Sequence, residues 1–244
     1  MNVLMYRQFF EVQKVHWWFL VRKTIVLDAI SRIPDLPKEL SILDVGSGSG
    51  VMLKSLEELG ETSGLDMSEE AIKFSKEIFS GEVRKGNLPD QVPFEQDAFH
   101  LITALDVIEH IEDDEGSIVA IKGLLKANGC AIVTVPAYRF LWTKFDVINE
   151  HKRRYTLTEL REKLVAAGFI VENISYFNTL LFPMVVIVRM LNKAWNRDGT
   201  SDIDMPPAWI NRILTFVFSL ERPLLKMTRL PFGVSIIATV RKAS

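Results

Sequence analysis

The chain has 244 residues, of which 48% are hydrophobic and 25% charged, as in an ordinary globular protein with a substantial core. Its formal net charge of −2 argues against nucleic acid as a partner, because no overall basic field would attract phosphates. A single cysteine excludes a disulfide framework and a cysteine-rich metal site. The N-terminal stretch lacks the basic and apolar regions of a secretory signal, so a cytoplasmic location is expected.

The first 38 residues are expected to form a helical cap. Apolar side chains recur at helical spacing through HWWFLVRKTIVLDAI, and Pro34 and Pro37 end the pattern. Adjacent indoles in HWWF point in different directions, so both cannot be buried in one core. We therefore expect Trp17 or Trp18 to close over a bound ligand, with plain core packing as the alternative.

From 39 to 176 the sequence alternates between short apolar runs and helical segments. The expected strands are LSILDV, TSGLDM, GEVRKGN, AFHLITAL and CAIVTVP, followed by a sixth within AAGFIVENISYF. Helices are expected over 51–59, after Ser68, from the acidic run Glu112–Glu115 to a stop at Asn128 and Gly129, and after the capping box TLTE. This alternation indicates βαβ units and a parallel sheet that is covered on both faces.

A segment of different character, 177–232, precedes a final strand-like run in 233–244. It holds two apolar helical segments separated by the polar loop NRDGTSDIDMPP. Its apolar run LLFPMVVIV is shorter than the roughly 20 residues that a membrane-spanning helix needs. The apolar faces could pack on the domain, line an apolar substrate pocket, form a homodimer, or make a peripheral membrane contact, and packing is the default expectation.

The stretch SILDVGSGSG, at the end of the first expected strand, predicts a ligand that comes close to the backbone. No lysine follows the glycines, which excludes a P-loop, and Gly50 comes one residue too early for a dinucleotide fingerprint. The carboxylate of Asp44 would repel a pyrophosphate and attract a cation. Asp66 ends the second strand, where a carboxylate can accept both hydroxyls of a ribose. These features favour S-adenosyl-L-methionine over NAD.

Five motifs in this order, LDVGSGSG, GLDMSEEAI, GNLPDQVPF, FHLITALDVIEHI and LLKANGCAIVTVP, resemble the class I S-adenosylmethionine-dependent methyltransferase family between Ser41 and Pro136. The resemblance implies one α/β domain over 1–244. It would be a Rossmann-like, doubly wound, seven-stranded sheet, mostly parallel with an antiparallel last strand. The helical cap would span 1–38, the cofactor-binding core 39–176, the helical insertion 177–232 and the last strand 233–244.

The resemblance also assigns cofactor-binding residues. Asp44 would lie near the ammonium group, with Gly46, Ser47 and Gly48 along the methionine portion. Asp66 would hold the ribose, Met67 would pack on the adenine, Asn87 and Leu88 would sit at the adenine edge, and Leu105 and Asp106 would flank the methyl-bearing end. Trp18 would close over the cofactor, since an aromatic face attracts a sulfonium cation. The family more often has aspartate where Asn87 stands.

The remaining candidates lie after the fourth and fifth strands. HWWF and EHKRRY together resemble elements of bacterial envelope and secondary-metabolite methyltransferases. His151 could act as a general base, and His110 could face the methyl group or substrate. Tyr138, Arg153 and Arg154 are expected to bind substrate, the arginines through a carboxylate or phosphate. The alternatives are a solvated basic turn for EHKRRY and a loop-shaping role for His110.

Taken together, these features predict in-line transfer of a methyl group from S-adenosylmethionine to a small-molecule or lipid or glycan-precursor acceptor. No metal is expected, because the histidines and acidic residues show no ligand spacing. Two alternatives stay open. One is a non-catalytic cofactor-binding or membrane-peripheral partner protein on the same fold, and the other is an NAD-dependent oxidoreductase.

Overall fold

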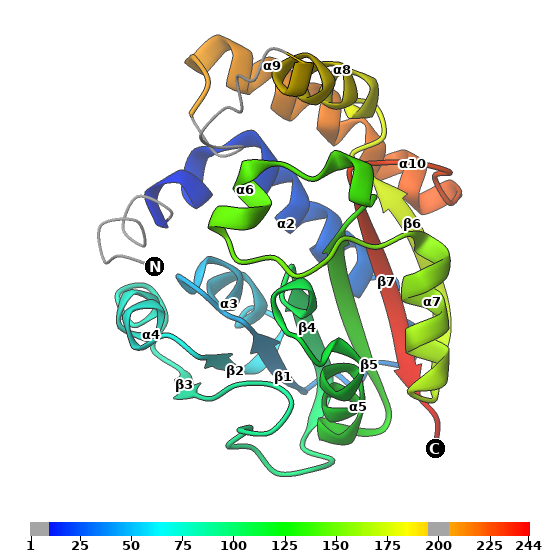
Figure 1. Ribbon diagram of the computed structural model, residues 1–244. Helices are drawn as coiled ribbons and strands as arrows, with labels where there is room; N and C mark the ends of the chain where they lie inside the picture. Colours follow the sequence, from blue (N-terminus) through cyan, green and yellow to red (C-terminus); the bar gives the residue numbers. More distant parts are fainter. Residues whose placement is uncertain (1–9, 195–204) are drawn as a thin grey trace.

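The structure, a computed structural model, describes residues 10–194 and 205–244 (Figure 1). The first nine residues of the expected cap and most of the expected polar loop, NRDGTSDIDMPP, lie outside the described residues.

Seven strands form one sheet in the order β3-β2-β1-β4-β5-β7-β6. Their bounds are β1 Leu40–Val45, β2 Gly60–Asp66, β3 Glu82–Lys85, β4 Phe99–Leu105, β5 Leu125–Pro136, β6 Phe169–Phe177 and β7 Ser235–Lys242. The first five strands pair in parallel, whereas β7 lies antiparallel between β5 and β6. The predicted Rossmann-like sheet with an antiparallel last strand is therefore confirmed.

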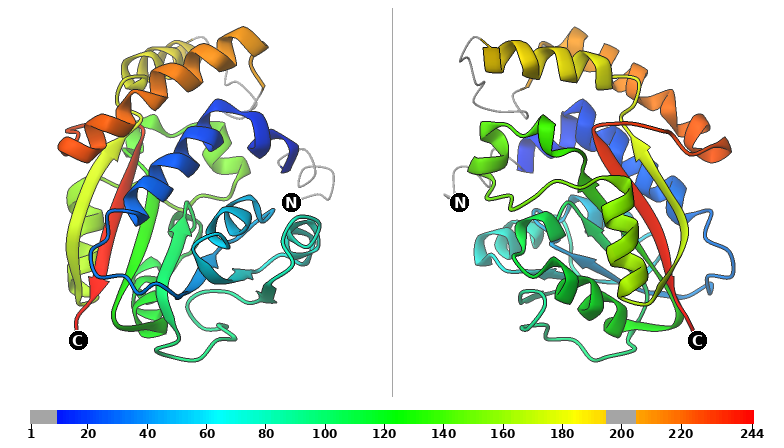
Figure 2. Two further views of the ribbon diagram at one scale, coloured as in Figure 1. Left: turned by 180° about the vertical axis from the view of Figure 1, so that it is seen from behind. Right: turned by 45° about the vertical axis from the view of Figure 1, so that its right-hand side comes forward.

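Helices cover both faces of this sheet (Figure 2). On one face α5 (Asp114–Leu124) and α7 (Leu157–Ala166) bury Ile118, Ile121, Leu160 and Leu164 against the strands. On the other face α2 (Trp17–Ile30) and α3 (Val51–Leu56) supply Val21, Ile25 and Leu56 to a second core. Apolar runs in β1, β4 and β5 are buried on both sides, which explains why they carry no hydrophobic alternation.

Two expected helix ends differ from the structure. Helix α3 ends at Leu56 and not at residue 59. Helix α5 ends at Leu124, so Asn128 and Gly129 lie within β5 and do not cap the helix. The pairing of β4 with β5 jumps from Phe99–Leu125 to Leu101–Cys130, which makes the intervening residues an insertion in the strand. Asn128 has a φ of 62° there, in the left-handed region. Residues with this conformation occur in β-bulges as well as at helix ends.

The insertion between β6 and β7 forms α8 (Phe182–Ala194), α9 (Ala208–Ser219) and α10 (Glu221–Met227). Helix α9 packs along α2, where the Asn211 side chain accepts from Trp17 N at 2.9 Å and donates to Val15 O at 2.8 Å. Arg222 of α10 forms a bidentate ion pair with Asp28 of α2. The N-terminal helix and the insertion are thus tied together. No helix within the described ranges is long and apolar enough to cross a membrane.

Candidate active site

The candidate site lies at the carboxyl ends of β1, β2 and β4, where an open parallel sheet binds its ligands. Helix α2 and the short helix α6 (Lys144–Ile148) pass over this edge of the sheet (Figure 1). The loop after β1, the 3-10 turn Ile108–His110 after β4 and the loop after β5 all meet there. Residues far apart in the sequence therefore contribute to a single site.

The glycine loop after β1 turns sharply between β1 and α3. Gly46, Gly48 and Gly50 all have positive φ, at 66°, 53° and 82°. A Cβ at Gly46 would lie 2.5 Å from a Val107 methyl carbon, so that position also lacks the room for a side chain. Ser47 is buried, and its hydroxyl has no hydrogen-bond partner among the described residues. An orphaned hydroxyl in this loop is suited to a bound polar ligand.

Asp44 is buried at the end of β1 with 3% of its surface exposed. It is aligned with Thr103 of β4, whose hydroxyl donates to Asp44 Oδ1 at 2.5 Å. Burial raises the pKa of Asp44 to about 7, although the Thr103 hydrogen bond and the Arg22 charge lower it. A buried carboxylate with a single hydrogen-bond donor is stabilised in its ionised form by a cationic ligand.

Asp66 ends β2 and faces the glycine loop. Its carboxylate accepts from Gly48 N and Ser68 N, both at 2.8 Å. Burial raises the pKa of Asp66, and these backbone donors oppose the shift. The next residue, Met67, leaves 67% of its surface exposed, which is unusual for methionine and suits a residue that packs on a flat ligand. The carboxylate predicted for the ribose thus lies beside the glycine loop, and the methionine predicted for the adenine directly follows it.

The two residues expected at the adenine edge differ in exposure. Asn87 is exposed, and its backbone pairs with that of Gln91. Leu88 is buried in the core with 3% exposed, so only its backbone can face a ligand. Leu105, also expected near the cofactor, is 8% exposed at the end of β4.

Asp106 follows β4 with a φ of 56°, an uncommon conformation for a non-glycine residue. It accepts a hydrogen bond from the Thr134 hydroxyl at 3.2 Å and forms an ion pair with Arg22 of α2. Nothing in the sequence pointed to Arg22, since it is one of two adjacent basic residues on a largely apolar helix. Its guanidinium places a positive charge at the mouth of the site, where it could bind a ligand carboxylate.

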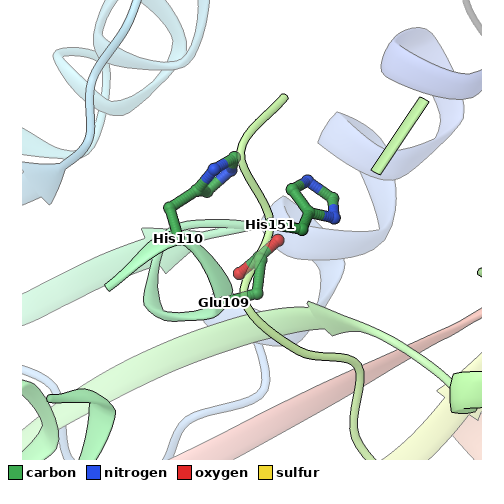
Figure 3. Close-up of side chains that lie close together, drawn as sticks. All are labelled: Glu109, His110 and His151. Atoms are coloured by element: carbon green, nitrogen blue, oxygen red, sulfur yellow. The ribbon is translucent and has the colours of Figure 1, made fainter. Parts of the chain in front are cut away.

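The side chains of Glu109, His110 and His151 form a cluster (Figure 3). The charge of Asp106 acts on Glu109 in this cluster. Glu109 is fully buried, and neither of its carboxylate oxygens has a hydrogen-bond partner in the described part of the chain. Burial and the nearby Asp106 charge raise the pKa of Glu109 well above its usual value. The rings of His110 and His151 meet edge to face with centroids 4.5 Å apart. The two histidines predicted for catalysis are therefore neighbours.

Each histidine is oriented by an oxygen acceptor. His110 Nδ1 lies 2.8 Å from the carbonyl oxygen of Asn149, and His151 Nδ1 lies 2.9 Å from Asp146 Oδ1. Burial and the neighbouring His151 lower the pKa of His110. Asp146 was not predicted as a functional residue. The sequence signal for Asp146 is the capping box that it forms with Thr143 at the start of α6.

Both arginines expected to bind substrate make internal contacts instead. Arg154 is buried, and it donates to both oxygens of Asp146 at 2.8 and 3.0 Å. Arg153 donates to Asp114 Oδ1 at 2.6 Å and to the Glu112 carbonyl at 2.7 Å. These guanidinium groups hold the loop that carries His151, and this geometry replaces the predicted substrate clamp.

Two further predicted site residues, Tyr138 and Trp18, both pack against other aromatic side chains. Tyr138, with a φ of 53°, stacks on Tyr176 at a centroid distance of 5.1 Å and touches Phe182 of α8. It therefore links the loop after β5 to the insertion. Trp18 lies parallel to Phe177 and Phe218, at 5.6 and 5.5 Å. This packing joins Trp18 to the core between α2 and α9, which is the alternative to the predicted lid.

A scan of protein families matches residues 20–174 to the methyltransferase domain family. The chain belongs to this family. Among curated proteins, it is 26% identical over 129 residues to a ubiquinone biosynthesis O-methyltransferase of Thiobacillus denitrificans, covering 48% of this chain and 47% of that one. The chain spans about half the length of the curated relatives it matches.

Solved structures share the fold at low sequence identity. Phosphoethanolamine N-methyltransferase 2 of Haemonchus contortus, in complex with S-adenosyl-L-methionine, aligns with a TM-score of 0.58 at 16% identity. The alignment covers 89% of this chain and 52% of that chain. The [4+2]-cyclase SpnF aligns with a TM-score of 0.56 at 18% identity, covering 89% and 80% of the two chains.

The family, the fold and the cofactor predicted from the sequence are confirmed by these comparisons. The site also fits S-adenosylmethionine on its own chemistry. It offers a buried carboxylate for an ammonium group, a second carboxylate for ribose hydroxyls, an orphaned serine hydroxyl and an exposed methionine. The NAD-dependent alternative loses its support, since the loop lacks the dinucleotide spacing and the family is that of methyltransferases.

Proposed function

We propose that the protein transfers a methyl group to a hydroxyl oxygen of a small acceptor with an apolar body or tail. The observation that carries the proposal is the pair of adjacent, oriented histidines, His110 after β4 near Asp106 and His151 after β5. The name of the curated relatives, ubiquinone biosynthesis O-methyltransferase, supports an oxygen nucleophile. When bound, S-adenosylmethionine supplies a methyl group on a positively charged sulfur. An oxygen nucleophile can attack the methyl carbon, and the sulfur then leaves as a neutral thioether.

Some residues of the site would bind the cofactor, and another would accept a proton from the acceptor. Asp44 would hold the ammonium group and Arg22 the carboxylate of the cofactor, and Asp66 would hold its ribose. His151 would accept the proton of the acceptor hydroxyl at Nε2, because Asp146 engages its Nδ1. Most of the rate enhancement would come from the orientation of the two reactants.

An apolar acceptor is supported by the surface beside the site. A wide, open groove is lined by Phe182, Pro183, Val186, Ile187 and Phe232, all of them apolar. Tyr138 at the end of β5 contacts Phe182, and Phe182 contacts Phe232 at a centroid distance of 5.4 Å. The groove is thus connected to the catalytic loops by aromatic side chains, as an acceptor with a tail would require.

The insertion would also bring the protein to a membrane surface. Its three helices and their flanks expose many apolar side chains: Leu180, Met184, Ile187, Val188, Met190, Leu191, Met205, Trp209, Ile213, Phe216, Leu220, Leu224, Met227 and Phe232. Exposed apolar side chains gathered in one insertion are typical of a surface that contacts a membrane or another protein. Exposed Trp209 and Arg212 on α9 suit a lipid headgroup region.

Activity is tested by incubating the protein with methyl-labelled S-adenosylmethionine and matched acceptors. Each acceptor is a hydroxylated ring with or without an isoprenoid tail, and an O-methylated analogue without a free hydroxyl is the control. We expect label on the tailed hydroxyl compound and none on the control. Label on no oxygen acceptor, or equal transfer to amine acceptors, would contradict the proposal.

Membrane contact is tested separately by co-sedimentation with phosphatidylcholine vesicles that contain phosphatidylglycerol. The variant Trp209→Ser/Phe216→Ser should lose binding, whereas Val119→Ser/Ile170→Ser, which changes exposed apolar residues elsewhere, should keep it. A dimer in size-exclusion chromatography that the first variant disrupts, without vesicle binding by the parent protein, would instead favour the homodimer that the sequence left open.

A further inference from the structure

The cluster of Glu109, His110 and His151 has a feature that proton transfer alone does not require. One ligand atom from each of these three side chains lies within 4.8 Å of the others (Figure 3). The three residues come from two separate loops, after β4 and after β5, which meet at the carboxyl edge of the sheet. The cluster therefore results from the tertiary fold, and its spacing in the sequence gave no indication of a metal site.

The hydrogen bonds of the two histidines fix which nitrogen is available. The acceptors of Nδ1 are the Asn149 carbonyl and the Asp146 carboxylate, and these oxygens only accept. Each Nδ1 must therefore carry the hydrogen, which leaves Nε2 with a free lone pair in the neutral ring. A histidine that donates Nδ1–H to a carbonyl or carboxylate while Nε2 faces a ligand is the usual arrangement around protein-bound metals.

Glu109 supplies the second, independent observation. Its side chain is fully buried, yet both carboxylate oxygens lack a hydrogen-bond partner in the described part of the chain. No described side chain donates to this buried carboxylate, and the only backbone donor that acts on it is its own N–H, so its charge is poorly stabilised and a bound cation would remove that cost. The Coulomb attraction of Arg22 and Arg154 reaches this carboxylate, but neither donates a hydrogen bond to it.

We infer that Glu109, His110 and His151 bind a divalent transition-metal ion such as Zn²⁺. Two imidazole nitrogens and one carboxylate leave coordination positions open, as in catalytic zinc sites. Bonds of about 2.0–2.2 Å would bring the ligand atoms to roughly 3–3.5 Å from one another. The largest separation, 4.8 Å, would therefore shrink by roughly 1.3–1.8 Å, a change that rotations of the histidine side chains can provide.

For catalysis the inference rests on the proposed function, and it changes the role of His151. An acceptor hydroxyl that coordinates the ion would become more acidic, so its proton could leave to water at neutral pH. The resulting alkoxide or phenoxide oxygen forms the new bond to the methyl carbon as the carbon–sulfur bond breaks. His151 would then be a ligand, oriented by Asp146, and not the proton acceptor.

The experiment measures metal binding by the full-length protein without cofactor or acceptor. Chelator-treated protein is titrated with Co²⁺, followed by its visible absorption and by calorimetry, and Zn²⁺ is used to displace it. We expect one equivalent to bind, with affinity reduced at least tenfold in Glu109→Gln and in His151→Ala. The exposed Glu112→Gln and the distant His100→Ala are the matched controls and should bind as the parent protein does.

Folding of each variant is checked by circular dichroism. Glu109→Gln keeps the volume of the side chain, and His110→Asn serves as a second ligand variant if His151→Ala does not fold. Absence of Co²⁺ binding, or unchanged affinity in a folded ligand variant, would overturn the metal site. Metal binding as expected, with full methyl transfer by the metal-free protein, would overturn the catalytic role of the ion. Neither outcome would contradict methyl transfer itself.

Discussion

Because Asp44 is proposed to hold the ammonium group of the cofactor, we expect cofactor affinity to depend on pH. Burial raises the pKa of Asp44 to about 7 in the ligand-free protein, whereas an ammonium group needs the ionised form. At pH 5.5 roughly 3% of such a carboxyl group is ionised, and at pH 7.0 about half is. Apparent affinity scales with the competent fraction, so affinity should rise about fifteenfold over this range, or about 1.6 kcal/mol.

The perturbation is Asp44→Asn, which keeps an oxygen that can accept from Thr103 and removes the titration. Calorimetric titration with S-adenosylmethionine between pH 5.5 and 7.0 is the assay, since an α-amino group stays largely protonated over that range. The variant should bind weakly with an affinity that is nearly independent of pH. Methylthioadenosine, which lacks the amino acid portion, should show little pH dependence with either protein. An equal slope in the variant and the parent protein would refute the role of Asp44.

The same shift predicts the effect of pH on stability. The folded-state pKa of Asp44 is raised above its unfolded value, so ionisation disfavours the folded state. The contribution of this group to stability is therefore lost as pH rises from about 4 to 7. Asp44→Asn cannot ionise, so it does not lose this stability as pH rises. Thermal melts of the two proteins should converge at low pH and diverge at neutral pH, with the variant the more stable; parallel curves would contradict the shift.

Three further predictions concern other parts of the site. Asp66→Ala should weaken S-adenosylmethionine binding by more than about 1 kcal/mol in calorimetry, because ribose hydroxyls and the Gly48 amide lose their acceptor; Glu70→Ala, which is exposed, is its control. Gly50→Ala should lower the melting temperature, since its Cβ would lie 2.8 Å from Ser75 Cβ at a φ of 82°; an unchanged melt would contradict the steric argument. His151→Ala should reduce kcat for a hydroxyl acceptor by about 10²–10⁴-fold with cofactor affinity unchanged, and a change in affinity alone would assign His151 to binding.

The sheet could be predicted because each strand is marked by its own short stretch of sequence. LSILDV and CAIVTVP are continuous apolar runs, and each is buried on both faces as the pattern indicates. Helix ends were less predictable, as the bulge at Asn128 illustrates. That residue and the following glycine suit a helix stop as well as a strand insertion, and the pairing with β4 decides between them.

The positions of Asp44, the glycine loop and Asp66 at the carboxyl edge of the sheet were predictable for a related reason, since each directly follows or ends a strand. The acceptor side of the site was not, because its geometry depends on contacts between distant segments. Arg22 reaches Asp106 across 84 positions, and Arg154 turns inward to Asp146. A basic pair in a loop appears the same in sequence whether it binds a substrate or a buried aspartate.

The charges of the site favour a positively charged cofactor. Asp44 and Glu109 are buried, and the half-buried Asp66 and Asp106 lie at the neighbouring strand ends. Burial raises the pKa of the first three, so the site holds carboxyl groups whose ionised forms are poorly stabilised. Arg22 offsets part of this charge, at Asp106. A sulfonium cation would supply more of the missing positive charge, and methyl transfer removes that cation. Substrate and product therefore differ in their electrostatic fit, which favours release of the neutral thioether after each turnover.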